Sequence, residues 1–474
     1  MKRTDKGTAY RVAVVPVVLS GGDYRTAHEA CHISALLWNH GIAELNKFWL
    51  ANEKDPTTKE MRHLVAAADE SLLALHAHTK QAIVDDLFDA VSTARKNRSE
   101  GARTRMPWRA KNYRPLIFTA GYGWRVSGDK ISMSLGRGRP GISVPLPAFS
   151  RDNGPVDASR WGEIKLCWDM DARRFSLHIA YRCAPVKTLN PDNRIAIDEG
   201  IINPMTLAIE TAEAFEVTVI NGRSARAVKH RRNTAVADLR SKMSRCTRGS
   251  RQWRKYNSAL KKVNSKAKSS LRNHDHQVSR KAANMAIEHD AGTVVVGDVR
   301  GIEQTTRKRD KRRFGRHQRR RLSQWSRGRQ ERYLSEKTGV ELTHQNEAYS
   351  SQTCPACLTR NRPSGRNYQC QACGFATHRD AVGAINILMR STHGAYTRID
   401  PNTPVRVTYL RATPLSVARS KANELGPRQA QKPAGVAELE PALSGVAADK
   451  TSLARRSEPC SPPISAGDTQ KPRP

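Results

Sequence analysis

The feature that most constrains this chain is a group of four cysteines arranged as two C-x-x-C pairs. Cys354-Pro-Ala-Cys357 is followed, after twelve residues, by Cys370-Gln-Ala-Cys373. Each pair places two thiolates on a tight turn, and four thiolates complete a tetrahedral zinc site with Zn–S distances of about 2.3 Å. Because such a site leaves no position for water, the spacing predicts a structural zinc ion. A redox dithiol pair would need a thioredoxin-like βαβ context, which the sequence lacks.

The other cysteines show no comparable spacing. A scattered set in a chain of this length indicates a reducing compartment and metal binding rather than a disulfide framework. The apolar run near the N-terminus breaks at Pro16 and favours a strand over a signal peptide. No window approaches the ~18 apolar residues of a membrane span. We therefore expect a cytoplasmic protein without membrane contact; that it is prokaryotic and nucleoid-associated is what the family resemblance given below implies. The scattered cysteines are Cys31, Cys167, Cys183, Cys246 and Cys460.

The charge balance predicts a polyanionic partner. The chain has 81 Lys and Arg against 44 Asp and Glu, a formal charge of +37 and a pI near 10.4. So large a field opposes compaction unless an anion neutralises it, and nucleic acid is favoured over a ribosomal or membrane surface as that anion. Two basic segments carry the candidate nucleic-acid-binding residues. These are Arg251, Arg254, Lys255, Lys261 and Lys262 in the first and Arg312, Arg313, Arg319, Arg320 and Arg321 in the second.

The hydrophobic pattern divides the chain into units of different secondary structure. An alternating run at 9–19 predicts a strand, the period changes to helical between about 24 and 98, and hairpins are predicted at about 110–190. The apolar run ending at Asp198 and the run VVVGDV at 294–299 predict buried strands, and a helix is expected from Asp380. The chain is therefore predicted to have a multidomain α+β fold.

Several carboxylates stand where they could share divalent cations. Asp198 ends a buried strand, where a charge is costly unless it is paired or bound to metal. Asp380 follows the cysteine cluster at a predicted helix start, where an N-cap is the alternative. Asp298 and Glu347 are candidates for a third ligand. Nucleases of the two-metal type hold Mg²⁺ ions about 3.5–4 Å apart between such groups, so the set predicts a magnesium site.

Five segments together resemble a known family. The segments Asp198-Glu-Gly200, VVVGDVRGI, EAYSSQTCPAC, CQACG and RDAVGAINI are similar to the split RuvC-like nuclease of TnpB proteins and compact type V CRISPR effectors, over roughly 190–390. The resemblance implies an RNase-H-like (RuvC) α/β nuclease domain with an inserted zinc ribbon, after an N-terminal wedge β-barrel with an inserted helical bundle. The implied units are a first wedge strand (1–23), a helical recognition bundle (24–105), a wedge barrel (106–190), the nuclease with a basic helical insertion (191–345), the ribbon (346–376), the last nuclease motif and helix (377–395) and a largely disordered tail (396–474).

The resemblance also implies catalytic positions, with one departure. The family's first and third motifs each carry an aspartate, and these match Asp198 and Asp380. The third pattern, R-D-x-N-A-A-x-N-I, is changed here at Val382 and Gly383. In the second motif, Gly297 replaces the usual glutamate. Three interpretations follow: an inactive site, substitution by the neighbouring Asp298, or a carboxylate supplied from elsewhere.

A relocated glutamate is the favoured interpretation. One branch of the family, linked to serine-recombinase insertion sequences, is similar in lacking this glutamate and carries another several dozen residues later, on the strand that leads into the ribbon. Glu347 stands at such a position. We expect that strand to neighbour the first strand of the sheet. The predicted magnesium ligands are therefore Asp198, Glu347 and Asp380, with Asp298 as the alternative.

The function implied by the resemblance is RNA-guided cleavage of double-stranded DNA. A guide RNA of the omega-RNA or crRNA type would pair with the target after a short flanking motif is read, and Mg²⁺ would support RuvC-type hydrolysis. The alternative is an RNA-guided repressor without nuclease activity. A third possibility, a transposase proper, would join transposon ends without RNA. Whether the chain acts as a monomer or homodimer, and whether it belongs to a transposon or a CRISPR locus, stays open.

Overall fold

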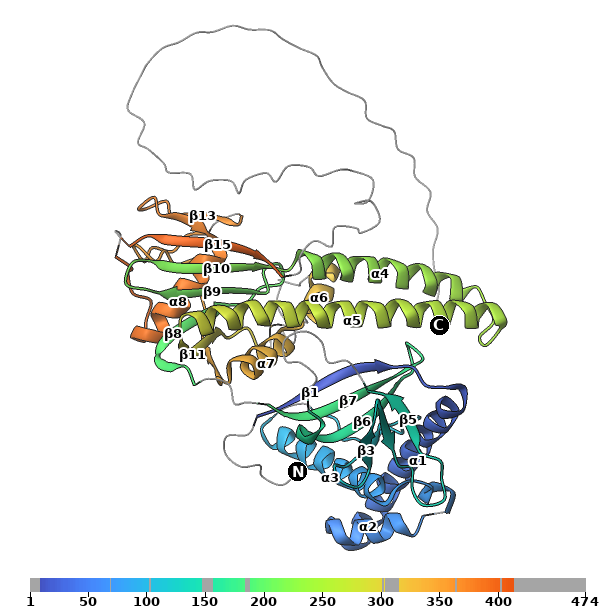
Figure 1. Ribbon diagram of the computed structural model, residues 1–474. Helices are drawn as coiled ribbons and strands as arrows, with labels where there is room; N and C mark the ends of the chain where they lie inside the picture. Colours follow the sequence, from blue (N-terminus) through green and yellow to red (C-terminus); the bar gives the residue numbers. More distant parts are fainter. Residues whose placement is uncertain are drawn as a thin grey trace, which may run out of the picture. The chain divides into compact units, whose positions relative to one another are not determined.

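The computed structural model describes residues 9–412, except 69, 102–103, 147–156, 184–187, 301, 303–314, 363–364 and 401–402 (Figure 1). Arg312, Arg313 and Cys460 lie outside the described residues. Among the helices that the structure does describe, none is both long enough and apolar enough to cross a membrane.

The N-terminal region begins with a strand and three helices. They are β1 (Ala9–Val17), α1 (Gly21–Asn52), α2 (Thr58–Ala66) and α3 (Ala77–Ser99), with a 3₁₀ turn at Glu70–Leu73. Thr57 and Glu60 form a capping box that starts α2, since each side chain accepts a hydrogen bond from the other residue's backbone N–H. Leu37 and Trp38 of α1 and Leu87 of α3 are buried in a shared core.

Six further strands complete this region in two sheets. They are β2 (Leu116–Phe118), β3 (Trp124–Ser127), β4 (Lys130–Met133), β5 (Ile142–Pro145), β6 (Trp161–Asp169) and β7 (Arg174–Cys183), with a 3₁₀ turn at Ala158–Arg160 before β6. One sheet has the order β1-β7-β6-β2 and the other β3-β4-β5. No strand pairing within the described ranges joins the two sheets into a closed barrel.

The second half of the chain is organised around a six-stranded sheet. Its strands are β8 (Asn190–Asp198), β9 (Met205–Glu210), β10 (Phe215–Asn221), β11 (Ala291–Gly297), β12 (Leu342–Gln345) and β15 (Val405–Arg411), in the order β12-β11-β8-β9-β10-β15. β9 is antiparallel to both of its neighbours, and the other pairings are parallel. β8, β11 and β12 therefore end at the same edge of the sheet.

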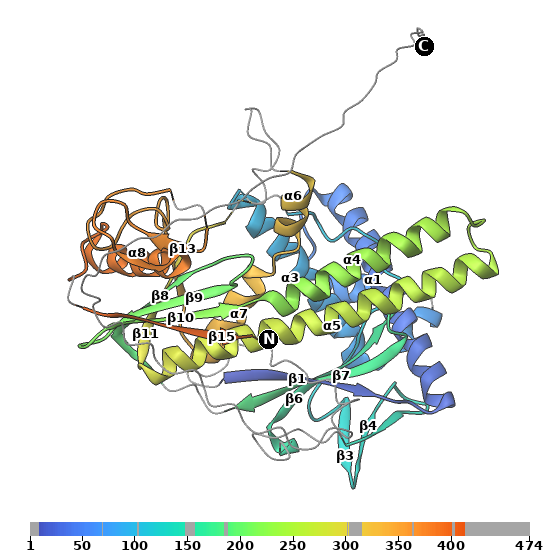
Figure 2. The same ribbon diagram turned by 90° about the horizontal axis from the view of Figure 1, so that it is seen from above.

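Successive side chains of β8 enter two separate cores. Ile195 and Ile197 pack with the long helix α5 (Arg251–Glu288), whereas Ala196 packs with α8 (Arg379–His393). Both ribbon views show these helices on opposite faces of the sheet (Figure 1 and Figure 2). Because the side-chain period of a strand is two, Asp198 lies on the α8 face.

The basic helices form a hairpin and two shorter elements. α4 (Arg223–Ser244) lies beside α5, and α6 (Arg316–Ser323) and α7 (Arg327–Thr338) follow (Figure 1). Asp275 of α5 is only 1% exposed and accepts hydrogen bonds of 2.7 Å from Ser326, Arg329 and Gln330. This buried carboxylate fixes the start of α7 to α5.

The segment that contains the four cysteines, residues 346–378, packs against α8 and is called the cysteine segment below. It contains the two-stranded sheet β13 (Asn367–Gln369) and β14 (Ala376–His378). The fully buried Asn386 of α8 donates hydrogen bonds of 2.7 Å to the carbonyl oxygens of Ser350 and Thr353. The chain between β12 and the first cysteine pair is thereby attached to the helix.

Two expectations about the sheet require correction. The strand leading into the ribbon, β12, pairs with β11 and not with the first strand β8. In addition, the predicted tail from residue 396 contains an ordered strand, because β15 pairs in parallel with β10 from Val405 to Arg411. Since β15 is an edge strand with an exposed face, its sequence lacks the continuous apolar run that marks the central strands.

Candidate nuclease and zinc sites

The four cysteines come together as the sequence predicts. Their Sγ atoms all lie within 4.8 Å of one another. Cys354 and Cys373 are 3.6 Å apart, and Cys357 and Cys370 are 3.5 Å apart. The geometry is consistent with a structural zinc site, because four thiolates leave no open coordination position. No other group of three or more possible ligands in the described parts of the chain is as tight.

The predicted carboxylates line one cleft of about 620 Å³. Asp198 ends β8, Asp298 follows β11 and Glu347 follows β12, while Asp380 lies in the first turn of α8. The ends of three parallel strands and the start of one helix thus meet at a single edge of the sheet. All four residues that the sequence proposed are therefore neighbours in space.

Burial and mutual repulsion oppose the ionisation of two of these carboxyls. The pKa of Asp198 is raised well above its ordinary value, mainly by burial and then by the charges of Asp380 and Glu347. Burial, followed by the charge of Asp298, raises the pKa of Glu347 to about 7, although Arg327 opposes this shift. The Oε2 atom of Glu347 is buried and has no hydrogen-bond partner in the parts of the chain that are described. A cation between these groups would relieve both costs.

Asp380 is instead paired. Its carboxylate forms an ion pair with Arg366 of the cysteine segment and accepts a 2.8 Å hydrogen bond from Asn203. The N-cap of α8 is His378, whose Nδ1 accepts from the backbone N–H of Asp380. The side chain of Asp380 is therefore not needed as a cap and faces the cleft.

Gly297 and Glu347 are sterically complementary. A Cβ atom at Gly297 would lie under 3.0 Å from the Oε2 atom of Glu347, and also 2.9 Å from Cδ1 of Ile387. Real Cβ atoms essentially never make such contacts. The absence of a side chain at position 297 therefore makes the space that the Glu347 carboxylate occupies.

Asp298 is less available than Glu347. Arg300 donates two side-chain hydrogen bonds, of 2.8 and 2.7 Å, to its two carboxylate oxygens, and the backbone N–H of Arg300 donates a third. These bonds hold the pKa of Asp298 well below its ordinary value. A ligand role for Asp298 would have to break them.

Two family models and several solved structures are similar to this chain. Residues 178–303 match a family model described as a probable transposase of the OrfB/IS605 type, and residues 329–387 match the Cas12f1-like TNB domain. A Cas12f1–sgRNA–target DNA complex is similar in fold, with a TM-score of 0.53 at 13% identity, covering 81% of this chain and 99% of that one. The chain resembles TnpB-like compact type V effectors.

Two other solved structures share less of this geometry. A CRISPR–Cas12f ternary complex has a TM-score of 0.32 at 15% identity, covering 78% of this chain and 82% of that one. CasPhi-2 (Cas12j) bound to crRNA and phosphorothioate DNA has a TM-score of 0.34 at 11% identity, covering 83% and 93%. No match was found among curated proteins.

The changed residues of the TnpB-like third motif have structural reasons. Val382 is fully buried and packs in the small core of the cysteine segment with Cys354 and Tyr368. A Cβ at Gly383 would lie 2.9 Å from Oδ2 of Asp198, so the glycine lets the helix approach that carboxylate. The altered motif thus fits its neighbours rather than disrupting the site.

The sequence interpretation missed a buried acid beside the cleft. The side chain of Glu199 is fully buried, and Arg327 forms an ion pair with it at 3.9 Å. Burial, and then the charge of Glu331, raise the pKa of Glu199 well above its ordinary value. Its place directly after Asp198 was the available signal. Asn203 and Arg366, which contact Asp380, had no signal in the sequence pattern.

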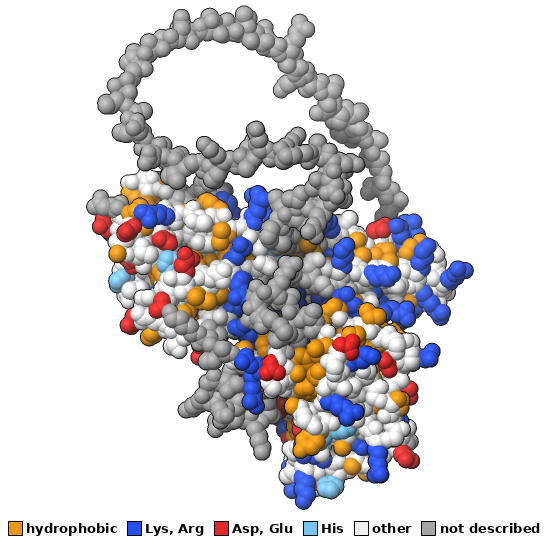
Figure 3. All heavy atoms as spheres, in the orientation of Figure 1, with side chains coloured by type: hydrophobic (Ala, Val, Ile, Leu, Met, Phe, Trp, Pro, Cys, Tyr) orange, Lys and Arg blue, Asp and Glu red, His pale blue; other side chains and the backbone are white. Residues whose placement is uncertain are grey.

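The predicted basic surface is present on the helices. Figure 3 shows Lys and Arg side chains gathered over the far ends of α4 and α5. Most of the predicted contact residues in the described ranges are exposed, and Lys261 is half-buried. The exposed ones are Arg251, Arg254, Lys255, Lys262, Arg319, Arg320 and Arg321.

Proposed function

We propose that this protein is an RNA-guided endonuclease that cleaves double-stranded DNA at a magnesium site formed by Asp198, Glu347 and Asp380. The observation that carries the proposal is the Oε2 atom of Glu347, which is buried, has no hydrogen-bond partner among the described residues and occupies the space left by Gly297. The charge of this carboxylate also acts on Asp198. An unpaired buried carboxylate costs several kcal/mol unless it stays protonated or binds a cation.

The donor chemistry of these residues suits magnesium, although their carboxylate oxygens are not gathered as tightly as the four thiolates. All three donors are carboxylates, the hard oxygen ligands that Mg²⁺ prefers, and the cleft leaves room for water and a phosphate. Bound there, Mg²⁺ would supply an activated water and stabilise the leaving oxygen. The remaining catalytic work falls to the chain itself. Arg366 and Arg379 line the same cleft and can hold the substrate phosphate by charge-assisted hydrogen bonds.

RNA guidance is supported by the charge and by the similar complexes. The exposed cations of α5 and α6 provide a surface that could bind a phosphate backbone, which suits a guide–target duplex recognised by shape. The solved complex with the similar fold contains an sgRNA and a target DNA. The DNA target would then be selected by base pairing with the guide RNA, and the protein would read a short flanking motif.

Plasmid cleavage tests this proposal. The chain is co-expressed with the DNA that flanks its gene, the co-purifying RNA is sequenced, and the purified complex is given Mg²⁺ and a plasmid carrying a matching target. We expect target-dependent linearisation that is lost in Asp198→Asn. Tight target binding without any cutting would contradict the nuclease proposal and would favour an RNA-guided repressor.

A paired substitution tests the third ligand. Glu347→Ala is expected to abolish cleavage, whereas Asp298→Ala is expected to retain it. Normal cutting by Glu347→Ala together with loss of cutting in Asp298→Ala would show that the assignment of Glu347 is wrong.

A further inference from the structure

A second hollow, of about 530 Å³, lies between α4 and α6. Seven basic residues supply much of its wall, and none of the described residues that line it is acidic. The helix α4 contributes Arg223, Arg226, Lys229 and His230, and α6 contributes His317, Arg320 and Arg321. This hollow is called the basic pocket below.

The sequence of α4 places its cations on one side of the helix. Arg223, Arg226 and His230 follow one another at spacings of three and four, so their side chains share a face. Within the described chain, no ion pair to an acidic group involves Arg223, Arg226 or Arg321. Like charges collected in this way repel one another, and a bound anion would remove that cost.

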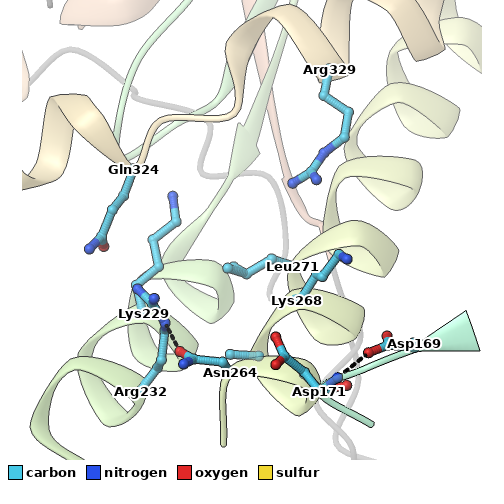
Figure 4. Close-up of a pocket in the computed structure, with 11 residues that line it drawn as sticks. Asp169, Asp171, Lys229, Arg232, Asn264, Lys268, Leu271, Gln324 and Arg329 are labelled. Carbon is cyan, nitrogen blue, oxygen red and sulfur yellow. Dashed lines mark hydrogen bonds between the residues drawn. The ribbon is translucent and has the colours of Figure 1, made fainter. Parts of the chain in front are cut away.

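Lys229 is half-buried in the wall of the basic pocket. Burial, only partly offset by the charge of Asp275, lowers the pKa of Lys229 below its ordinary value. Figure 4, a close-up of the adjoining pocket, shows Lys229 extending from α4 toward Gln324, which also lines the basic pocket. On the same helix, Arg232 donates a 3.0 Å hydrogen bond to Asn264 of α5 (Figure 4) and is thus held by the protein. For Arg223 and Arg226, nearer the start of α4, no side-chain hydrogen bond of this kind is seen among the described residues.

The basic pocket adjoins the carboxylate cleft. Ile201 lines the pocket, and Asp198, which lines the cleft, is only three residues earlier. Three residues of chain span at most about 11 Å. The start of α4 is fixed to this loop, because the backbone N–H of Gly222 donates a 2.8 Å hydrogen bond to the carbonyl of Ile202. A strand with one phosphate at Asp198 therefore brings neighbouring phosphates to the pocket.

We propose that the basic pocket binds backbone phosphates of the single DNA strand that enters the carboxylate cleft, and so sets which phosphate reaches Asp198. The proposal rests on the nuclease function proposed above. A volume of about 530 Å³ is that of a small-ligand pocket and suits one or two nucleotides of a single strand rather than a duplex. Sequence-independent binding of this kind needs only cations along the backbone.

Salt-dependent binding of a single strand tests the proposal without requiring cleavage. The full chain with its co-purified RNA, carrying Asp198→Asn, is titrated with a fluorescein-labelled single-stranded DNA oligonucleotide at several salt concentrations. Each phosphate contact adds about 0.7 to the slope of log K against log salt. Arg223→Gln/Arg226→Gln is therefore expected to reduce this slope by about 1 to 1.5.

Two further variants and a comparison of DNA with RNA make the result decisive. Arg398→Gln/Arg406→Gln removes the same charge from exposed positions near and on the edge strand β15 and should leave the slope unchanged. Arg223→Lys/Arg226→Lys keeps the charge and should keep the slope, which separates phosphate binding from a folding defect. Equal slopes for the Gln pocket variant and the unsubstituted pocket would overturn the proposal. A slope change seen with RNA but not with DNA would also overturn it.

The outcome is independent of the nuclease proposal. If the unsubstituted complex fails to cut DNA, the nuclease function falls while the slopes still report on the pocket. If it cuts, a methylphosphonate in place of the phosphate next to the scissile one should slow the unsubstituted enzyme about tenfold and the Arg223→Gln/Arg226→Gln variant much less, because the variant has already lost that contact. Equal slowing of both enzymes would contradict the pocket assignment.

Discussion

Arg366, in the segment between the two cysteine pairs, forms an ion pair with Asp380, the carboxylate at the start of α8. The cysteine segment thus places a positive charge where a divalent cation would bind. Because the guanidinium and the metal compete for the same oxygens, the ion pair should raise the magnesium concentration that cleavage requires.

Arg366→Gln is accordingly expected to lower the Mg²⁺ concentration for half-maximal cleavage by about three- to tenfold, the range of an exposed to partly buried ion pair. The measurement is an initial-rate titration with Mg²⁺. Arg362→Gln removes an exposed charge from the same segment and should not change the titration. An unchanged or higher requirement in Arg366→Gln would mean that Arg366 does not compete with the metal.

The pairing of Gly297 with Glu347 predicts compensation between two substitutions. Gly297→Glu alone should be inactive, because its side chain would overlap the Glu347 carboxylate. Glu347→Gly alone should lose at least ~100-fold in rate, as expected when a metal ligand is removed. The double variant Gly297→Glu/Glu347→Gly should recover part of the activity. Recovery is measured as the cleavage rate relative to each single variant, and a double variant no better than both would contradict a shared carboxylate position.

The hydrogen bonds of Asn386 predict that the stability of the cysteine segment depends on its attachment to α8. Asn386→Ala would leave the buried carbonyls of Ser350 and Thr353 without donors, at a cost of about 2–4 kcal/mol. Thermal unfolding should shift to lower temperature, and zinc release to a colorimetric chelator should become faster. Ser391→Ala, in the last turn of the same helix, is the matched control. Unchanged zinc release in Asn386→Ala would show that the cysteine segment folds independently of α8.

Removal of the zinc ion is expected to disturb the carboxylate cleft as well as the cysteine segment. We expect one zinc ion per chain, lost in Cys370→Ser, and loss of DNA cleavage with it, because Arg366 and the segment from Glu347 to Cys354 are positioned by the folded cysteine segment. Zinc content is measured on the purified protein and compared with Cys246→Ser, which changes a cysteine outside the cluster. Full cleavage by a zinc-free protein would contradict this dependence.

The environment of His276 predicts that the folded protein becomes less stable as the pH falls. Its ring stacks on Tyr333 at 3.9 Å, and burial together with the charges of Lys337 and Arg272 lowers its pKa to about 4. The unfolded chain takes up this proton near pH 6.5, whereas the folded chain does not until about pH 4, so stability falls as the pH decreases through that window. His276→Gln should lessen the fall in the urea midpoint between pH 7 and 5. His393→Gln, an exposed control, should not.

Local features allowed much of the site to be predicted from the sequence. The zinc ligands are identifiable because the spacing of two C-x-x-C pairs suffices to define them. Asp198 ends an apolar strand and Asp380 follows the cysteines at a helix start, but each position alone also fits a cap or a surface charge. Their choice as metal ligands came from the resemblance of five segments to a known family and stays a prediction. Each of these signals lies within a few residues of its position.

What the sequence could not provide depends on packing between distant segments. Glu347 reaches the cleft although β12 is two strands away from β8, because the space at Gly297 admits its side chain. Strand β15 was missed because an edge strand carries little apolar signal of its own. The ion pair of Arg366 with Asp380 and the burial of Glu199 likewise appear only when the sheet, α8 and the cysteine segment are assembled.

The overlap between a side chain at position 297 and the Glu347 carboxylate limits how such a protein can evolve. A lineage that moves the acidic group from one strand end to the other cannot hold both in place at once. One route loses the side chain at position 297 first and passes through an ancestor with a weakened active centre. The other route gains the acid at position 347 first, with its side chain turned away from the cleft until position 297 becomes glycine. Volume therefore decides when the second acid can act, because the Glu347 carboxylate can occupy its place in the cleft only after position 297 has lost its side chain.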